Sequence, residues 1–202
     1  MVKGSVARFA PEELERLRRP ANGLAGGSTA SPVKGERDSD RAMRPDRQTK
    51  EPPLPRPTFM DIALEEARLA AARNETPVGA VIVRGDEIIA RGGNETRQRN
   101  DPTAHAEIVA IRAAAARLGS ERLPDCDLYV TLEPCAMCAA AISFARIRRL
   151  YYGAADPKGG GVDAGPRFFS QPTCHHAPEV YSDIAARESA ELLRGFFQAR
   201  RS

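Results

Sequence analysis

The stretch CDLYVTLEPCAMCAAAISFARIRRLYYGA, residues 126–154, constrains the fold most, because two apolar strand patterns flank a short Ala-rich helix pattern. A strand, a helix of about ten residues and a second strand form a right-handed βαβ unit, and the two strands of such a unit are parallel. The sequence therefore predicts a layered α/β fold.

Further elements surround this unit. Thr58, with Asp61 three residues on, has the spacing of a helix-capping pair. Apolar periodicity and turn residues predict the other elements, which are a helix from Thr58, a hairpin of residues 78–84 and 87–93, a helix at 104–119, a short strand at 179–181 and a helix at 185–201. We expect a mixed sheet with helices on both faces. Arg148 and Arg149 are expected to be solvated surface residues of a strand.

The first 57 residues differ in composition from the rest. They hold half of the 16 prolines and little apolar sequence. Such a segment cannot bury enough apolar surface to offset the entropy of ordering. We therefore expect a disordered, Pro-rich and charged N-terminal extension at 1–57 and one globular domain at 58–202. The alternatives are a basic arm that contacts RNA, or a start codon placed too far upstream.

Charge and hydropathy limit the classes of partner. The formal net charge is +3, but the positive excess lies in residues 1–57, so the charge of the domain gives no evidence for nucleic acid. We find no apolar run of membrane-spanning length and no apolar core of a secretion signal, and expect a cytoplasmic protein without membrane contact. Thiols stay reduced there, so a C-x-x-C pair indicates metal or redox chemistry before a disulfide.

Two cysteines stand where the βαβ unit turns from strand to helix. Cys135 and Cys138 are three residues apart, so they project from one face, and the helix N-terminus favours their thiolate form. His105 stands at the start of the other Ala-rich helix and adds an imidazole if both helices lie on one face of the sheet. Three protein ligands and an open position for water are typical of catalytic zinc.

Glu107 follows His105 at a spacing that lets the two residues straddle a pocket. Zinc lowers the pKa of its water to about 7, and a neighbouring carboxylate can carry the released proton to a substrate. Two other interpretations of the cysteines remain open. Cys126 or Cys174 could supply a fourth ligand and close a structural site, and the C-x-x-C pair could be a redox pair.

The combination of H-x-E with P-C-x-x-C resembles the signature of zinc-dependent nucleobase deaminases. The stretches TPVGAVIV, NDPTAHAEI, DLYVTLEPCAMCAAAI and RIRRLYYGAADPK further resemble bacterial tRNA-specific adenosine deaminases, over roughly Phe59 to Arg201. The resemblance implies a three-layer α/β/α cytidine-deaminase-like fold with a mixed five-stranded sheet. It also implies one Zn²⁺ per subunit, a homodimer, and conversion of the wobble adenosine of a tRNA anticodon arm to inosine.

The resemblance assigns zinc binding and proton transfer to the four residues already named. It adds five substrate-binding residues, which are Asn94, Ala106, Pro134, Asp156 and Lys158. Asn94 would contact the flipped base, the Pro134 carbonyl would face its exocyclic amine, and the Ala106 backbone amide would face the attacked side. Asp156 and Lys158 would lie along the anticodon loop.

Two rival functions remain. A deaminase of a free base or nucleoside, such as cytosine, guanine or a nucleotide, would carry the same signature, because pocket shape and flanking contacts choose the base. A non-catalytic RNA-binding subunit would keep zinc for structure alone and would have no need of Glu107.

The stretch GGGVDAGPRFFSQPTCHHAPEVY departs from the family pattern. We expect a loop that packs over the domain through Phe168 and Phe169. The alternatives are base stacking by these phenylalanines, or a second metal at Cys174, His175 and His176.

Overall fold

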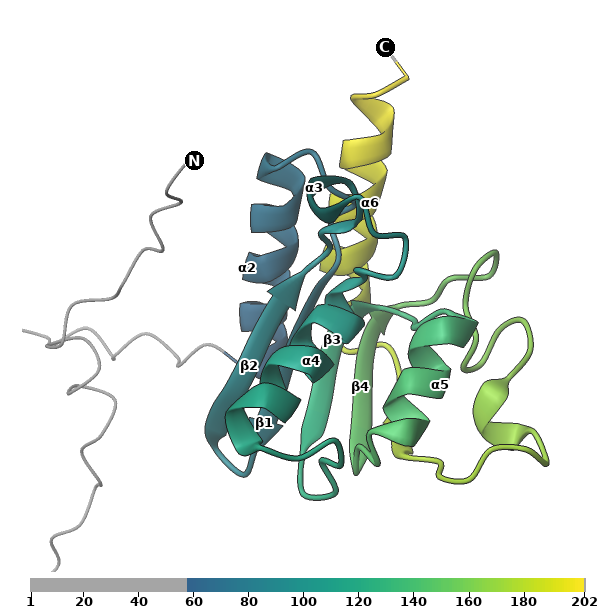
Figure 1. The fold of residues 1–202 in the computed structure, drawn as a ribbon. Coiled ribbons are helices and arrows are strands. Elements are labelled where there is room, and N and C mark those ends of the chain that lie inside the picture. Colours follow the sequence, from purple (N-terminus) through teal and green to yellow (C-terminus); the bar gives the residue numbers. More distant parts are fainter. Residues whose placement is uncertain (1–57, 202) are drawn as a thin grey trace, which may run out of the picture. The chain divides into compact units, whose positions relative to one another are not determined.

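The computed structural model describes residues 58–201, and the predicted extension at 1–57 lies outside the described residues. The elements in chain order are α2 (Phe59–Ala72), β1 (Gly79–Arg84), β2 (Glu87–Gly93), α3 (Thr96–Arg99), α4 (Ala106–Leu118), β3 (Asp127–Leu132), α5 (Ala136–Phe144), β4 (Arg149–Ala154), the 3₁₀ turn η1 (Phe168–Ser170), β5 (Glu179–Tyr181) and α6 (Ala186–Gln198) (Figure 1). In this part of the chain, no helix combines the length and the apolar character needed to cross a bilayer.

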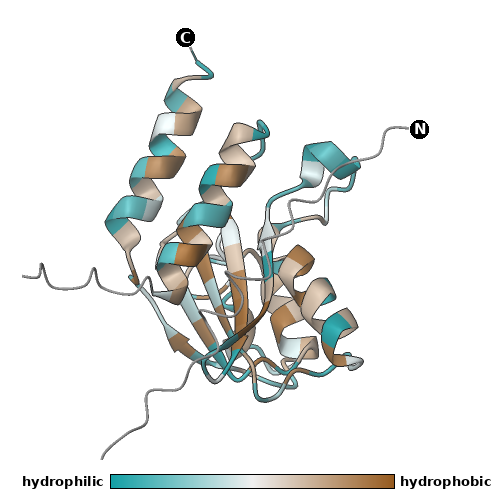
Figure 2. Cartoon of the chain, turned by 90° about the vertical axis from the view of Figure 1, so that its left-hand side faces the viewer, coloured by the Kyte–Doolittle hydropathy of each residue, from teal (hydrophilic) through white to brown (hydrophobic). Residues whose placement is uncertain are grey.

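The strands form one mixed sheet in the order β2-β1-β3-β4-β5. β1 pairs antiparallel with β2 and β3, whereas β3, β4 and β5 run parallel. Helices α4 and α5 lie on one face, and α2 and α6 on the other, so that the apolar strands lie between two helical layers (Figures 1 and 2). The predicted five-stranded α/β/α architecture is confirmed.

The first helix packs closely on the sheet for two local reasons. Thr58 and Asp61 form the predicted capping box, in which each side chain bonds to the other residue's backbone N–H. Gly79 of β1 then allows α2 to approach, since a Cβ at this position would lie 2.0 Å from the Ala63 carbonyl oxygen. Burial of Met60 and Ala63 against Val81 fills the contact between this helix and the sheet.

The larger apolar core lies between the sheet and the pair α4 and α5, where Leu128, Ile142 and Leu150 are fully buried. This core holds the two helices on one face with their N-termini close together. His105 is the N-cap residue of α4, and Cys135 is the N-cap residue of α5. Pro134 directly precedes the N-cap residue of α5.

The loop after β4 agrees with the main expectation. Phe168 and Phe169 pack against the core and meet edge to face. The alternative of a second metal site finds no support, because the Cys174 sulfur contacts the Ser143 hydroxyl at 3.6 Å, and His176 Nε2 lies 2.7 Å from the Ile147 carbonyl oxygen.

Arg148 and Arg149, at the beginning of β4, are partly exposed as expected, but both form ion pairs that the sequence did not indicate. Arg148 donates two hydrogen bonds to Asp127, at 2.8 and 2.9 Å, and Arg149 pairs with Glu179. Asp127 is buried and starts the neighbouring strand, so the ion pair joins β3 to β4 at one end of the parallel pair.

Candidate zinc and active site

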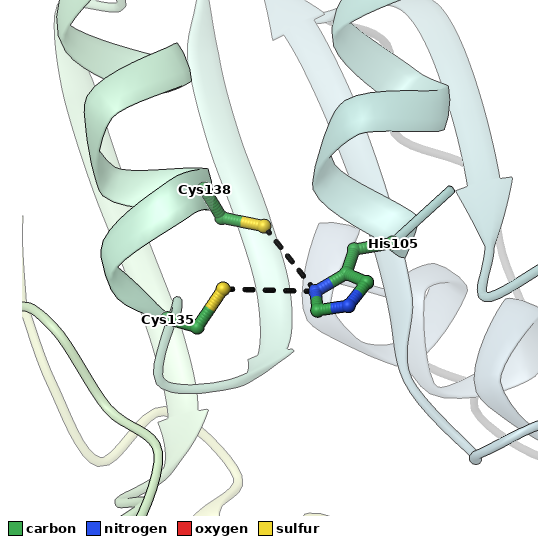
Figure 3. Close-up of side chains that lie close together, drawn as sticks. All are labelled: His105, Cys135 and Cys138. Carbon is green, nitrogen blue, oxygen red and sulfur yellow. Dashed lines mark hydrogen bonds between the residues drawn. The ribbon is translucent and has the colours of Figure 1, made fainter. Parts of the chain in front are cut away.

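Three side chains from two helix starts converge on one point (Figure 3). The Nδ1 atom of His105 lies 3.7 Å from the Cys135 sulfur and 3.6 Å from the Cys138 sulfur. All three ligand atoms lie within 4.8 Å of one another, and the group includes neither Cys126 nor Cys174 among residues 58–201. The arrangement can therefore offer three protein ligands to a metal, and the described part of the chain brings no fourth one to this point.

The spacing of these atoms fits a zinc ion. In a tetrahedral site with Zn–N of about 2.1 Å and Zn–S of about 2.3 Å, nitrogen and sulfur ligands lie about 3.6 Å apart. One imidazole and two thiolates also form a donor set that zinc prefers. Nδ1 is the ring nitrogen that faces both sulfurs, so it is the atom that would hold the metal.

The two thiols are electrostatically coupled. Hydrogen bonds from Cys138 and His105 to the Cys135 sulfur lower the pKa of Cys135 to about 4, against the opposing effect of burial. The same pairing with Cys135, together with burial, raises the pKa of Cys138. A divalent cation between the sulfurs replaces the shared proton and stabilises both thiolates.

Glu107 lies in the first turn of α4 and is only 3% exposed. Burial raises its pKa above the ordinary value, and the positive charge of His105 opposes this effect only partly. A carboxyl group in this environment holds a proton more readily than one in water, which suits it to both acceptance and donation of a proton.

A cavity of about 290 Å³ opens beside the ligands. This volume is at the small end of the range of ligand sites, roughly 300 to 1,000 Å³. Five of the nine predicted site residues line it, namely Asn94, His105, Glu107, Cys135 and Asp156. Cys138 is fully buried and completes the ligand group.

Three predicted substrate residues do not line the cavity. Ala106 is fully buried at the start of α4, and Lys158 is exposed. The Pro134 carbonyl accepts a hydrogen bond of 2.8 Å from the Gly161 backbone, so one of its two lone pairs is already used. Asp156 lines the cavity, but its Oδ1 accepts from the Lys158 and Gly159 backbone N–H groups and so shapes its own loop.

Sequence reasoning missed the other residues of the cavity wall, which are Thr76, Val78, Thr96, Leu132, Glu133 and Gly159. Glu133 is the most notable of these, since it is 2% exposed and its carboxylate accepts from the backbone of Asp156, Val162, Asp163 and Ala164. The sequence held no signal for this role, because the partners of Glu133 are backbone N–H groups of a distant loop.

Comparisons with known proteins agree with this geometry. Residues 55–154 match the family model described as the cytidine and deoxycytidylate deaminase zinc-binding region. A tRNA-specific adenosine deaminase of Agrobacterium fabrum is 68% identical over 143 residues, which cover 71% of this chain and 94% of that protein. One of Rickettsia bellii is 50% identical over 138 residues, covering 67% of this chain and 95% of that protein.

A solved structure gives the same result. It comes from studies of A-to-I editing by tRNA:A34 deaminases at the wobble position of transfer RNA, and it is 70% identical to this chain. The match covers 67% of this chain and 98% of that one, with a TM-score of 0.66. The chain therefore belongs to the tRNA-specific adenosine deaminases, within the zinc-dependent cytidine and deoxycytidylate deaminase family.

Proposed function

We propose that this protein deaminates adenosine to inosine at the wobble position of a tRNA anticodon. The observation that carries the proposal is the convergence of His105, Cys135 and Cys138 at the wall of a base-sized cavity that also contains Glu107. The chain's high identity to tRNA-specific adenosine deaminases supports the choice of substrate.

Zinc, when bound by the three ligands, supplies an activated water and stabilises negative charge. Glu107 carries the protons. Glu107 would take a proton from the water that attacks C6 of adenine, pass it to the adjacent ring nitrogen, and then carry the hydroxyl proton of the C6 adduct to the amine, so that the C6–N bond breaks as the C6 carbonyl forms. The departing group is released as ammonia.

The remaining substrate roles follow the walls of the cavity. The Asn94 side chain contacts the extruded base from the strand β2 side, and Asp156 shapes the rim where the anticodon loop enters. The Ala106 amide and the second lone pair of the Pro134 carbonyl hold the base, with the carbonyl facing its exocyclic amine. Lys158, on the exposed rim loop, reaches the RNA backbone. An anticodon loop presents unstacked bases, so extrusion costs little.

The rivals differ in substrate or in the use of Glu107. A non-catalytic subunit has no use for a buried acid beside the metal ligands, which argues against that rival. The free-base rival is tested by incubation of the zinc-loaded protein with a tRNA anticodon stem-loop, free cytidine and free guanine. Inosine in the stem-loop supports the proposal. Turnover of the free bases without inosine in the stem-loop would contradict it and favour the free-base deaminase.

The cellular location and the oligomeric state of the protein belong to the same proposal. The protein acts in the cytoplasm, where reduced thiols remain available for zinc. It forms a homodimer, which would cover exposed apolar side chains such as Phe144, 70% exposed at the end of α5. Light scattering at several protein concentrations tests the dimer, and a monomer mass throughout would contradict it.

A further inference from the structure

Glu75 is a buried acid, only 1% exposed, in the turn between α2 and β1. Four neutral donors satisfy it. Its Oε1 accepts from the backbone N–H groups of Arg97 and Gln98, both at 2.8 Å. Its Oε2 accepts from the Asn94 side-chain amide and the Thr96 hydroxyl, both at 3.2 Å. The two oxygens therefore have separate tasks.

The first oxygen caps the short helix α3. The N-cap residue of this helix, Glu95, makes no capping hydrogen bond with its own side chain. Glu75 supplies that acceptor from a position more than 20 residues earlier in the chain. The cap fixes the start of α3, and with it the backbone that carries Thr96.

The second oxygen orients the side chains that face the cavity. Asn94 and Thr96 line the cavity, whereas Glu75 does not. The Asn94 amide nitrogen also donates to the Thr96 hydroxyl at 3.1 Å, which closes a triangle of three polar groups. Because a carboxylate only accepts, the nitrogen of the Asn94 amide has to face Glu75, and the orientation of the amide is fixed.

We infer that Glu75 is a positioning residue for the substrate base, acting through Asn94. It touches no substrate atom. It sets whether the oxygen or the nitrogen of the Asn94 amide faces the base. It therefore determines which hydrogen-bonding edge of the base fits the cavity. This inference rests on the proposed contact between Asn94 and the extruded base.

Glu75→Gln separates the two tasks. The new amide keeps one oxygen, which continues to accept from the two N–H groups of α3. It turns an NH₂ group toward the Asn94 amide nitrogen, where donor now meets donor, whereas the Thr96 hydroxyl can rotate to accept. The Asn94 amide then has to turn over, while the fold and the zinc ligands keep their contacts.

A double-mutant cycle tests this on the full-length, zinc-loaded chain. We expect Glu75→Gln to lower kcat on an anticodon stem-loop by roughly 10- to 100-fold, the factor for one misplaced buried polar group. KM changes little, because the RNA is held mainly outside the cavity. In an Asn94→Ala background the same substitution has no further effect. Glu87→Gln, at an exposed ion pair with Arg117, is the matched control and leaves kcat unchanged.

Two kinetic results would overturn the inference. One is an unchanged kcat in Glu75→Gln. The other is an equal loss from Glu75→Gln with and without Asn94, since that is the behaviour of a purely structural acid. A second readout is independent of activity: the NMR signals of the Asn94 side-chain NH₂, assigned with Asn94→Ala, shift in Glu75→Gln and not in Glu87→Gln. Unshifted signals contradict the inference.

The outcome of the double-mutant cycle can be distinguished from a failure of the proposed function. If the wild-type chain forms no inosine but deaminates free guanine or cytidine, the proposed function is wrong. The same cycle on that substrate then still decides the role of Glu75.

Discussion

His105 and Cys135 occupy equivalent places in their helices, each as the N-cap residue, and His105 Nδ1 lies 3.7 Å from the Cys135 sulfur. An N-cap residue has extended backbone geometry, so its side chain can turn away from the helix surface. The helix ends also favour the thiolate that a metal binds. Two adjacent helix starts thus create a metal site without any ligand from a loop interior.

The buried acid next to this site gives the first prediction. Glu107→Ala removes the buried carboxylate beside the metal ligands to which we assign proton transfer, so turnover falls by about 10²- to 10⁴-fold. Zinc content by elemental analysis and the melting temperature stay close to the wild type, because no ligand is lost. Glu121→Ala, which removes a surface acid paired with Arg122, serves as the control and keeps full activity. Normal turnover in Glu107→Ala would assign the proton transfer to another group.

The ligand group predicts a sharp contrast between cysteines. Cys135→Ala loses both bound zinc and activity, since two protein ligands hold the metal far more weakly than three. Cys174→Ser keeps one zinc per chain, because the Cys174 sulfur contacts Ser143 and the His176 carbonyl instead. Elemental analysis of the two proteins after dialysis decides the matter. Zinc loss in Cys174→Ser would show that this thiol is a fourth ligand.

The ion pair between β3 and β4 concerns stability alone. Arg148→Met leaves Asp127, which is 6% exposed, without two of its donors. We expect the free energy of unfolding in urea to fall measurably, because only Arg149, at 3.9 Å, still pairs with this buried acid. Deamination kinetics stay unchanged. Arg187→Met, at an exposed pair with Glu188, should leave the free energy of unfolding almost unchanged. Equal losses in both variants would contradict the role given to Asp127.

Glu75 makes stability depend on pH in a defined direction. Burial raises its pKa, but its hydrogen bonds outweigh burial and hold the pKa below the ordinary value of 4.5. Its stabilising contribution is therefore complete above about pH 4.5 and is lost as pH falls through the lower, folded-state pKa. The stability gap between wild type and Glu75→Gln should narrow from about pH 6 to about pH 3. Zinc release at low pH affects both proteins and cancels in the difference. A gap that widens on acidification would reverse the assignment.

The zinc ligands could be predicted from the sequence because their signal is local. Cys135 and Cys138 follow an apolar strand at helix-start spacing, and His105 opens a second helix, so only the packing of both helices on one face of the sheet had to be assumed. The hairpin and the parallel pair also followed from apolar periodicity. The position of the hairpin in the sheet could not be predicted from periodicity. The pairing of β1 with β3 depends on contacts between segments that are distant in the sequence.

The supporting acids could not be predicted in the same way. Glu75 and Glu133 find their partners in backbone N–H groups more than 20 residues away, and backbone groups leave no mark in the sequence. Helix α3 was missed for a related reason. Its four residues show no apolar period, and the acceptor that caps it comes from Glu75.

The most direct test of the account is a deamination assay with the wild-type, zinc-loaded protein and a tRNA anticodon stem-loop that carries adenosine at the wobble position. We predict inosine at that position alone, with a guanosine-containing stem-loop left unchanged and activity lost on removal of zinc. Absence of inosine from a protein that holds one zinc per chain would contradict the proposed function.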